Sequence, residues 1–138
     1  MIRLTIFLFL VLGFSGCRRD QDEIPYVFVD FYISISDPNF FALNAVGGYV
    51  YVTEGSKRII VNRKSQTEFM AYDRHCSYKP SDPCSKVAVD PNSNLLLKDD
   101  CCGSVFLITD GSPNSGPAVR ALKRYQAAFD GATIHVYN

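Results

Sequence analysis

Cysteines are the residues of this chain whose type and spacing most clearly permit chemistry. The sequence contains five of them, one near its start and four further along, namely Cys17, Cys76, Cys84, Cys101 and Cys102. Four neighbouring thiols can form two disulfides, bind one metal ion or iron–sulfur cluster, or form one disulfide and leave two thiols free. The compartment of the protein matters here, because disulfides persist outside the cytosol.

The first residues resemble the signal peptide of a bacterial lipoprotein. Arg3 provides a positive start, and residues 4–14 form an apolar run, shorter than the roughly 20 residues that span a bilayer. The run ends in Phe14-Ser15-Gly16-Cys17, which resembles the lipobox, whose cysteine is acylated and becomes the mature N-terminus. The resemblance implies a signal peptide over residues 1–16 and lipidation of Cys17. An ordinary secretion signal or a single membrane span is the alternative.

This resemblance also implies a location. The protein is expected in the bacterial cell envelope, anchored to a membrane through its lipid and facing the periplasm or the cell surface. The polar residues that follow predict a flexible leash over residues 17–25, because they show no apolar periodicity.

The mature chain has the size of one domain. Removal of the signal peptide takes 16 of the 138 residues and leaves 122, enough for a hydrophobic core, which we place in residues 26–138. Arg3 is removed as well, so that 13 of the 14 basic residues remain beside 14 acidic ones. This balance provides no concentrated basic surface, and we therefore expect no nucleic-acid partner.

β-Strands are predicted through most of the mature chain. Apolar and polar residues alternate from Tyr26 to Ser36. Short apolar or alternating runs follow at 49–53, 58–61, 68–72, 86–89, 95–97, 105–108, 125–129 and 133–137. Turns are predicted at 110–117 and at Asp130-Gly131, which indicates a hairpin, and only 38–46 can form a short helix. These features predict an all-β domain, a small antiparallel sandwich or barrel.

Three segments in the second half of the chain resemble the loops of the Rieske iron–sulfur domain. The strand at 68–72 leads to Cys76, the segment 99–104 reads Asp-Asp-Cys-Cys-Gly-Ser, and 115–118 reads Ser-Gly-Pro-Ala. In that family two loops with the patterns C-x-H and C-x-C-H-G-S hold a [2Fe–2S] cluster, and an S-G-P-A loop covers it. The resemblance extends from about Ile59 to Tyr137. It implies a Rieske-like fold, with Gly116 and Pro117 in the covering loop.

The ligand positions depart from the family pattern. A Rieske centre holds one iron by two cysteines and the other by two histidines. When the Gly-Ser at 103–104 is set against the family's Gly-Ser, Cys102 takes the place of the histidine and Asp99 that of the ligating cysteine. The first loop keeps Cys76 but has Tyr78 where histidine is expected. The [2Fe–2S] centre is therefore predicted to be altered or lost.

Three interpretations of the thiols remain open. In the first, Cys76 pairs with Cys102, and Cys84 pairs with Cys101 as the resemblance implies, since a disulfide links the two loops in many Rieske proteins. In the second, a [2Fe–2S] cluster keeps altered ligands from these cysteines, with Asp99 or His75 as further donors. In the third, the same sulfurs bind zinc, although the spacing lacks the usual C-x-x-C pairs. Free or intermolecular thiols complete the alternatives.

Two polar features carry weaker predictions. His75 could lower the pKa of the adjacent Cys76 and make a thiol active in disulfide exchange, but an exposed loop histidine is the simpler interpretation. Asp99 and Asp100 are expected to be solvated turn residues.

We find no catalytic residue set in the sequence and expect no enzymatic activity of its own. The expected function is one-electron transfer to a redox partner protein through a modified or relic [2Fe–2S] centre. The alternative is a cluster-free, disulfide-stabilised structural or interaction module of the cell envelope.

Overall fold

The computed structural model describes residues 22–138, which form ten β-strands and one short 3₁₀ helix. All strand pairs are antiparallel, so the predicted all-β class is confirmed. The predicted signal peptide and Cys17 lie outside the described residues. Within the described part, no helix has the length and apolar character needed to cross a membrane.

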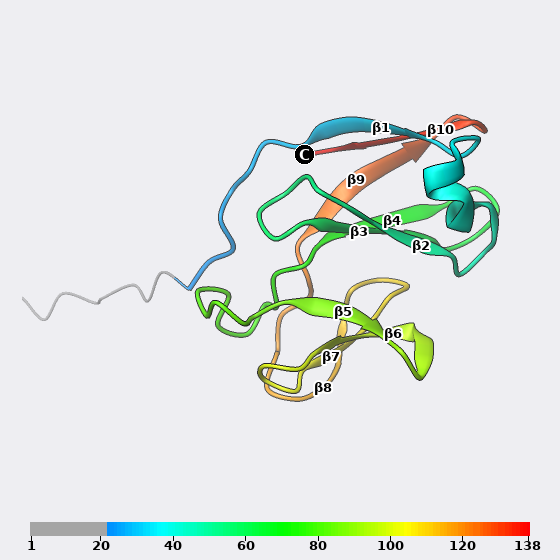
Figure 1. Ribbon diagram of the computed structural model, residues 1–138. Coiled ribbons are helices and arrows are strands. Elements are labelled where there is room, and N and C mark those ends of the chain that lie inside the picture. Colours follow the sequence, from blue (N-terminus) through cyan, green and yellow to red (C-terminus); the bar gives the residue numbers. More distant parts are fainter. Residues whose placement is uncertain (1–21) are drawn as a thin grey trace, which may run out of the picture.

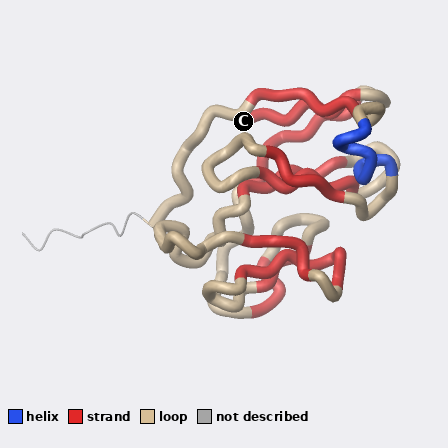
Figure 2. The backbone as a smooth tube through the Cα atoms, viewed as in Figure 1, coloured by secondary structure: helices blue, strands red, loops and turns tan. Residues whose placement is uncertain are grey.

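The strands form two sheets, one above the other in Figure 1. The larger sheet has six strands in the order β1 (Asp30–Ser34), β10 (Thr133–Tyr137), β9 (Arg124–Phe129), β4 (Phe69–Asp73), β3 (Ile59–Arg63) and β2 (Tyr49–Val52). The smaller sheet has four strands in the order β5 (Val87–Asp90), β6 (Ser93–Asp99), β7 (Val105–Leu107) and β8 (Pro113–Ser115). Loops join the two sheets, as Figure 2 shows.

The smaller sheet is an insertion between two neighbouring strands of the larger one. The chain leaves β4 at Asp73, builds β5 to β8, and returns at Arg124 to pair β9 with β4. Tyr72 is opposite Arg124 in that pairing. Since the insertion starts and ends at the same place, the segments that enter and leave it lie close together.

Strands β3 and β4 are buried along their whole length because each of their faces packs into a different core. Ile59 and Val61 point into the core of the larger sheet, whereas Ile60 and Tyr72 point into the core shared with the smaller sheet. The two hydrophobic cores therefore lie on opposite faces of β3 and β4. The smaller sheet packs against one of these two faces.

Several element boundaries differ from those predicted. The first strand begins only at Asp30, and the predicted helix is a 3₁₀ helix, η1 (Pro38–Asn44), capped by the Asp37 side chain. Strand β8 lies inside the predicted turn at 110–117, because its polar sequence Pro-Asn-Ser carries no apolar alternation. The predicted hairpin at Asp130-Gly131 is confirmed, and it joins β9 to β10. The segment around 26–53 supplies both edge strands of the larger sheet.

Candidate functional site

The first loop of the candidate site runs from β4 to β5 and carries Cys76. Its two ends are held together, because the backbone N–H of Val87 donates to the carbonyl of Arg74 at 2.8 Å and the Arg74 guanidinium donates back to the carbonyl of Val87. The Arg74 guanidinium also lies over the ring of Tyr51, 4.2 Å from its centre. Cys76 is fully buried at the start of this loop.

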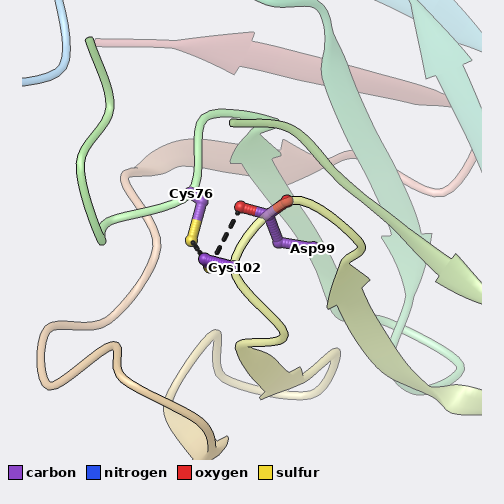
Figure 3. Close-up of side chains that lie close together, drawn as sticks. All are labelled: Cys76, Asp99 and Cys102. Atoms are coloured by element: carbon purple, nitrogen blue, oxygen red, sulfur yellow. Dashed lines mark hydrogen bonds between the residues drawn. The ribbon is translucent and has the colours of Figure 1, made fainter. Parts of the chain in front are cut away.

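The second loop, between β6 and β7, carries Asp99, Cys101 and Cys102. It is closed by two backbone hydrogen bonds, from Asp99 N–H to the carbonyl of Ser104 and from Gly103 N–H to the carbonyl of Asp99. The N–H of Cys101 donates to Asp99 Oδ1 at 2.8 Å and turns that carboxylate into the loop. Figure 3 shows the Asp99 and Cys102 side chains pointing toward Cys76.

A disulfide between Cys84 and Cys101 joins the two loops. Their Cα atoms are 5.7 Å apart, within the roughly 4.4–6.8 Å usual for disulfides. The predicted pairing of these two cysteines is confirmed. Because both sulfurs are used in this bond, a zinc or cluster site built from all four cysteines is excluded.

The other predicted bridge is not formed. Cys76 and Cys102 are free thiols whose sulfur atoms lie 3.6 Å apart, much further than the roughly 2.05 Å of an S–S bond. The structure nevertheless brings the two thiols into direct contact at the place where the two loops meet.

Asp99 is the third member of the site, and its surroundings were wrongly predicted. It is 0% exposed, and its Oδ2 lies 3.3 Å from Cys102 Sγ. Only the neighbouring Asp100 is exposed as expected, and it pairs with Lys98 at 2.9 Å. The two adjacent aspartates differ because the N–H of Cys101 draws the first one inward, an interaction that neither residue type signals on its own.

The site contains no neighbouring positive charge. Among residues 22–138, the ion pairs involve other carboxylates, and none involves Asp99. Burial is the main cause that raises the pKa of the Cys76 thiol to about 12; the backbone of Tyr78 lowers this pKa, whereas Asp99 and Cys102 raise it. Near neutral pH Cys76 is therefore a protonated thiol and a poor nucleophile, which argues against disulfide exchange at this position.

His75 does not activate Cys76, and the prediction that it is exposed is wrong. Its side chain is buried, and its Nδ1 lies 2.8 Å from Oδ1 of Asp73. Asp73 also accepts hydrogen bonds from the Tyr125 hydroxyl and from the backbone N–H of Ser56. Sequence reasoning missed Asp73, although an aspartate at the end of an apolar strand, two residues before a histidine, is a usable signal of such a turn.

The segment that contains Gly116 and Pro117 packs beside the second loop. Gly116 has φ of +89°, Pro117 is exposed, and the N–H of the buried Ala118 donates to Ser104 Oγ at 3.1 Å. Further along, the Arg120 guanidinium donates to the carbonyl of Ser77 in the first loop. This segment therefore bonds to both loops, which agrees with the covering position implied for it.

A methyl group at Gly116 is expected to displace this segment. An added Cβ would lie 2.6 Å from Ser104 Cα and 2.7 Å from the carbonyl oxygen of Gly103. We expect Gly116→Ala to lower stability by about 1–2 kcal/mol more than Gly47→Ala, and to speed alkylation of Cys102. Gly47 is the matched control, since its φ is +84° but an added Cβ would meet no atom within 4 Å. Equal stability and equal alkylation rates in the two variants would contradict the close packing.

The residues present do not fit a [2Fe–2S] cluster. Such a cluster needs four terminal protein ligands, two for each iron. In the described part of the chain, three metal-binding groups converge, with the donor atoms of Cys76, Asp99 and Cys102 within 4.8 Å of one another. Tyr78, at the fourth family position, packs half-buried against the core of the smaller sheet. One of the two irons would therefore lack one of its two protein ligands.

No protein-family model and no curated protein matches this chain. What the site can do is therefore inferred from its chemistry. It combines two thiols in contact, one buried carboxylate and one disulfide that holds their loops together. These groups can bind a metal ion or be oxidised to a second disulfide.

Proposed function

We propose that this chain is a lipid-anchored protein of the bacterial cell envelope whose Rieske-like domain acts as a cluster-free, disulfide-stabilised binding module. The observation that carries the proposal is the use of Cys84 and Cys101 in a disulfide, which leaves three donors at the converging loops. The loops keep their arrangement while the ligand set for two irons is incomplete.

The Rieske-like assignment is supported by how the loops are built. A small sheet inserted between two strands of a larger sheet presents two loops joined by a disulfide. The segment 115–118 lies against the second of these loops through Gly116 and Ala118. These three features support the proposed Rieske-like assignment.

The proposed anchor would place the site close to the membrane. The start of the described chain lies beside the first loop (Figure 1), where Asp22 Oδ1 accepts a hydrogen bond from the N–H of Ser81. Arg120 and Lys123 donate to the backbone carbonyls of Asp22 and Pro25. Four residues lie between Cys17 and Asp22, and the five steps along the chain reach at most about 18 Å. A lipid on Cys17 would therefore hold the two loops near the bilayer surface.

Electron transfer is the second candidate function. It is favoured by the convergence of both loops and the segment 115–118 on one buried position that contains two sulfur atoms. This alternative would need a redox partner protein and a fourth ligand beyond the three converging donors.

Analysis of the mature protein, purified from membranes in detergent, tests the proposal. We expect the wild type in the membrane fraction with a covalently bound fatty acid, detected by labelling with a fatty-acid analogue, and the Cys17→Ala variant without that label. The purified protein is expected to contain neither iron nor inorganic sulfide, and to show two free thiols and one disulfide after denaturation with a chelator. Stoichiometric iron and sulfide would overturn the cluster-free proposal in favour of electron transfer, and a wild type that carries no fatty acid on Cys17 would overturn the anchor.

A further inference from the structure

We infer that Cys76, Asp99 and Cys102 bind one divalent metal ion, Zn²⁺ by the chemistry of the donors, with a fourth position open to water or an external ligand. The inference rests on the proposed cluster-free state of the domain. It differs from the zinc site considered from the sequence, because two of the four cysteines are used in the disulfide and a carboxylate takes part instead.

Two of the three donor–donor distances are close to those around a single tetrahedral ion. Zinc lies about 2.3 Å from thiolate sulfur and about 2.0–2.2 Å from carboxylate oxygen, so a tetrahedral site separates two sulfurs by roughly 3.7 Å and sulfur from oxygen by roughly 3.6 Å. In the structure, the sulfurs of Cys76 and Cys102 are 3.6 Å apart, and Cys102 Sγ lies 3.3 Å from Asp99 Oδ2 (Figure 3). Cys76 Sγ and the nearer Asp99 oxygen lie within 4.8 Å of each other, so a movement of at most about 1.2 Å would complete the site.

Burial of the Asp99 carboxylate favours a bound cation. The residue is 0% exposed, and among residues 22–138 it belongs to no ion pair. A buried carboxylate is costly unless it is paired with a positive charge or coordinates a metal. An ion between Asp99 and the two sulfurs would supply that charge and displace the two thiol protons, leaving two thiolates as ligands.

The groups around the three donors form hydrogen bonds that can orient them as metal ligands. The N–H of Cys101 donates a hydrogen bond to Asp99 Oδ1, so that the other carboxylate oxygen, Oδ2, faces Cys102. Ser104 Oγ accepts from Ala118 N–H, and it lies 3.0 Å from Cys102 Sγ, so its own proton can be donated to a thiolate there. Hydrogen bonds of this kind orient ligands and tune metal affinity.

The donor set selects the metal and the type of site. Two thiolates disfavour Mg²⁺ and Ca²⁺, which prefer oxygen ligands. A set of two thiolates and one carboxylate suits Zn²⁺. Three protein ligands and one open position are typical of catalytic zinc sites, whereas structural sites use four protein ligands. Cys102 is only half-buried, so a small ligand can approach from that side.

Metal titration of the mature protein in detergent tests this inference. Bound metal is removed with a chelator, and Zn²⁺ is added against a chromophoric competitor under anaerobic conditions, without a reductant that would break the Cys84–Cys101 disulfide. We expect one ion per chain, and Co²⁺ in its place should show tetrahedral absorption bands and thiolate-to-cobalt charge transfer. Asp99→Asn is expected to weaken Zn²⁺ binding roughly 100-fold or more. The matched control Asp100→Asn alters the neighbouring exposed carboxylate and should leave the affinity unchanged.

A second variant keeps the test decisive if Asp99→Asn fails to fold. Cys102→Ser removes one of two thiolates and is expected to reduce the cobalt charge-transfer intensity by about half. Equal Zn²⁺ affinity in wild type and a folded Asp99→Asn variant would overturn the inferred ligand set. A cluster-free protein that binds no Zn²⁺ would overturn this inference alone, whereas iron with inorganic sulfide would overturn the proposed function as well.

Discussion

Replacement of both Cys84 and Cys101 by serine is expected to lower the free energy of unfolding by about 3 kcal/mol, within a range of about 2–5 kcal/mol. The two cysteines are 17 residues apart in sequence, and their bond restricts the unfolded chain over that loop. The bond also connects the loop that carries Cys76 to the loop that carries Cys102. Chemical denaturation of the double variant, followed by a spectroscopic signal, measures the loss.

Cys102→Ala is the control for this variant. It removes a thiol next to Cys101 but leaves the disulfide intact, so it should cost clearly less than the double substitution. The wild type treated with a reductant should approach the stability of the double variant. A double variant as stable as the wild type would show that the bond contributes nothing to the folded domain.

The sequence predicts a strand well when one face of that strand is buried. It predicts a strand poorly when neither face is buried. Strand β10 (Thr133–Tyr137) alternates buried Ile134 and Val136 with more exposed residues, and the same period is visible in the sequence. Strand β8 has no apolar residue that faces a core, and it is held by backbone pairing with β7. Backbone pairing of a polar edge strand leaves little trace in a single sequence.

Of the residues around the candidate site, the Cys84–Cys101 disulfide was predicted correctly and the burial of Asp99 was not. The pairing of Cys84 with Cys101 followed from a family resemblance, since four cysteines allow three connectivities and spacing does not choose among them. Asp99 was missed as a buried group because it precedes Asp100 and looks like part of a polar turn. Its burial depends on one backbone hydrogen bond from Cys101, which only the folded loop provides.

The adjacent cysteines illustrate how local geometry resolves the alternatives. Successive side chains on extended backbone point in opposite directions, which disfavours two adjacent ligands on one cluster. In the structure Cys101 bonds to Cys84 and Cys102 contacts Cys76. One dipeptide therefore provides the link between the loops and a donor of the candidate site, so the disulfide and the site depend on the same short segment.

Asp73→Ala is expected to lower the free energy of unfolding by roughly 3–5 kcal/mol, since each hydrogen bond to a charged group contributes about 1.5–3 kcal/mol. The Asp73 carboxylate is 0% exposed and accepts hydrogen bonds from the Tyr125 hydroxyl at 2.9 Å, from His75 Nδ1 at 2.8 Å and from two backbone N–H groups. It thereby joins β4 to β9 at the point where the chain leaves for the smaller sheet. Its removal would leave several buried donors without acceptors. Denaturant titration of the folded variant measures the effect.

The same carboxylate predicts a dependence of stability on pH. Burial alone would raise the pKa of Asp73, but the hydrogen bonds from His75, Ser56 and Tyr125 outweigh it and hold the pKa below its ordinary value of 3.8. Because the folded pKa is lower than the unfolded one, the stabilisation is complete above the unfolded pKa and is lost as the pH falls through the folded pKa. We therefore expect Asp73→Asn to flatten the acid limb of a plot of stability against pH. Asp100→Asn, at an exposed carboxylate, should reproduce the wild-type curve, and an unchanged acid limb in Asp73→Asn would show that this network does not govern acid unfolding.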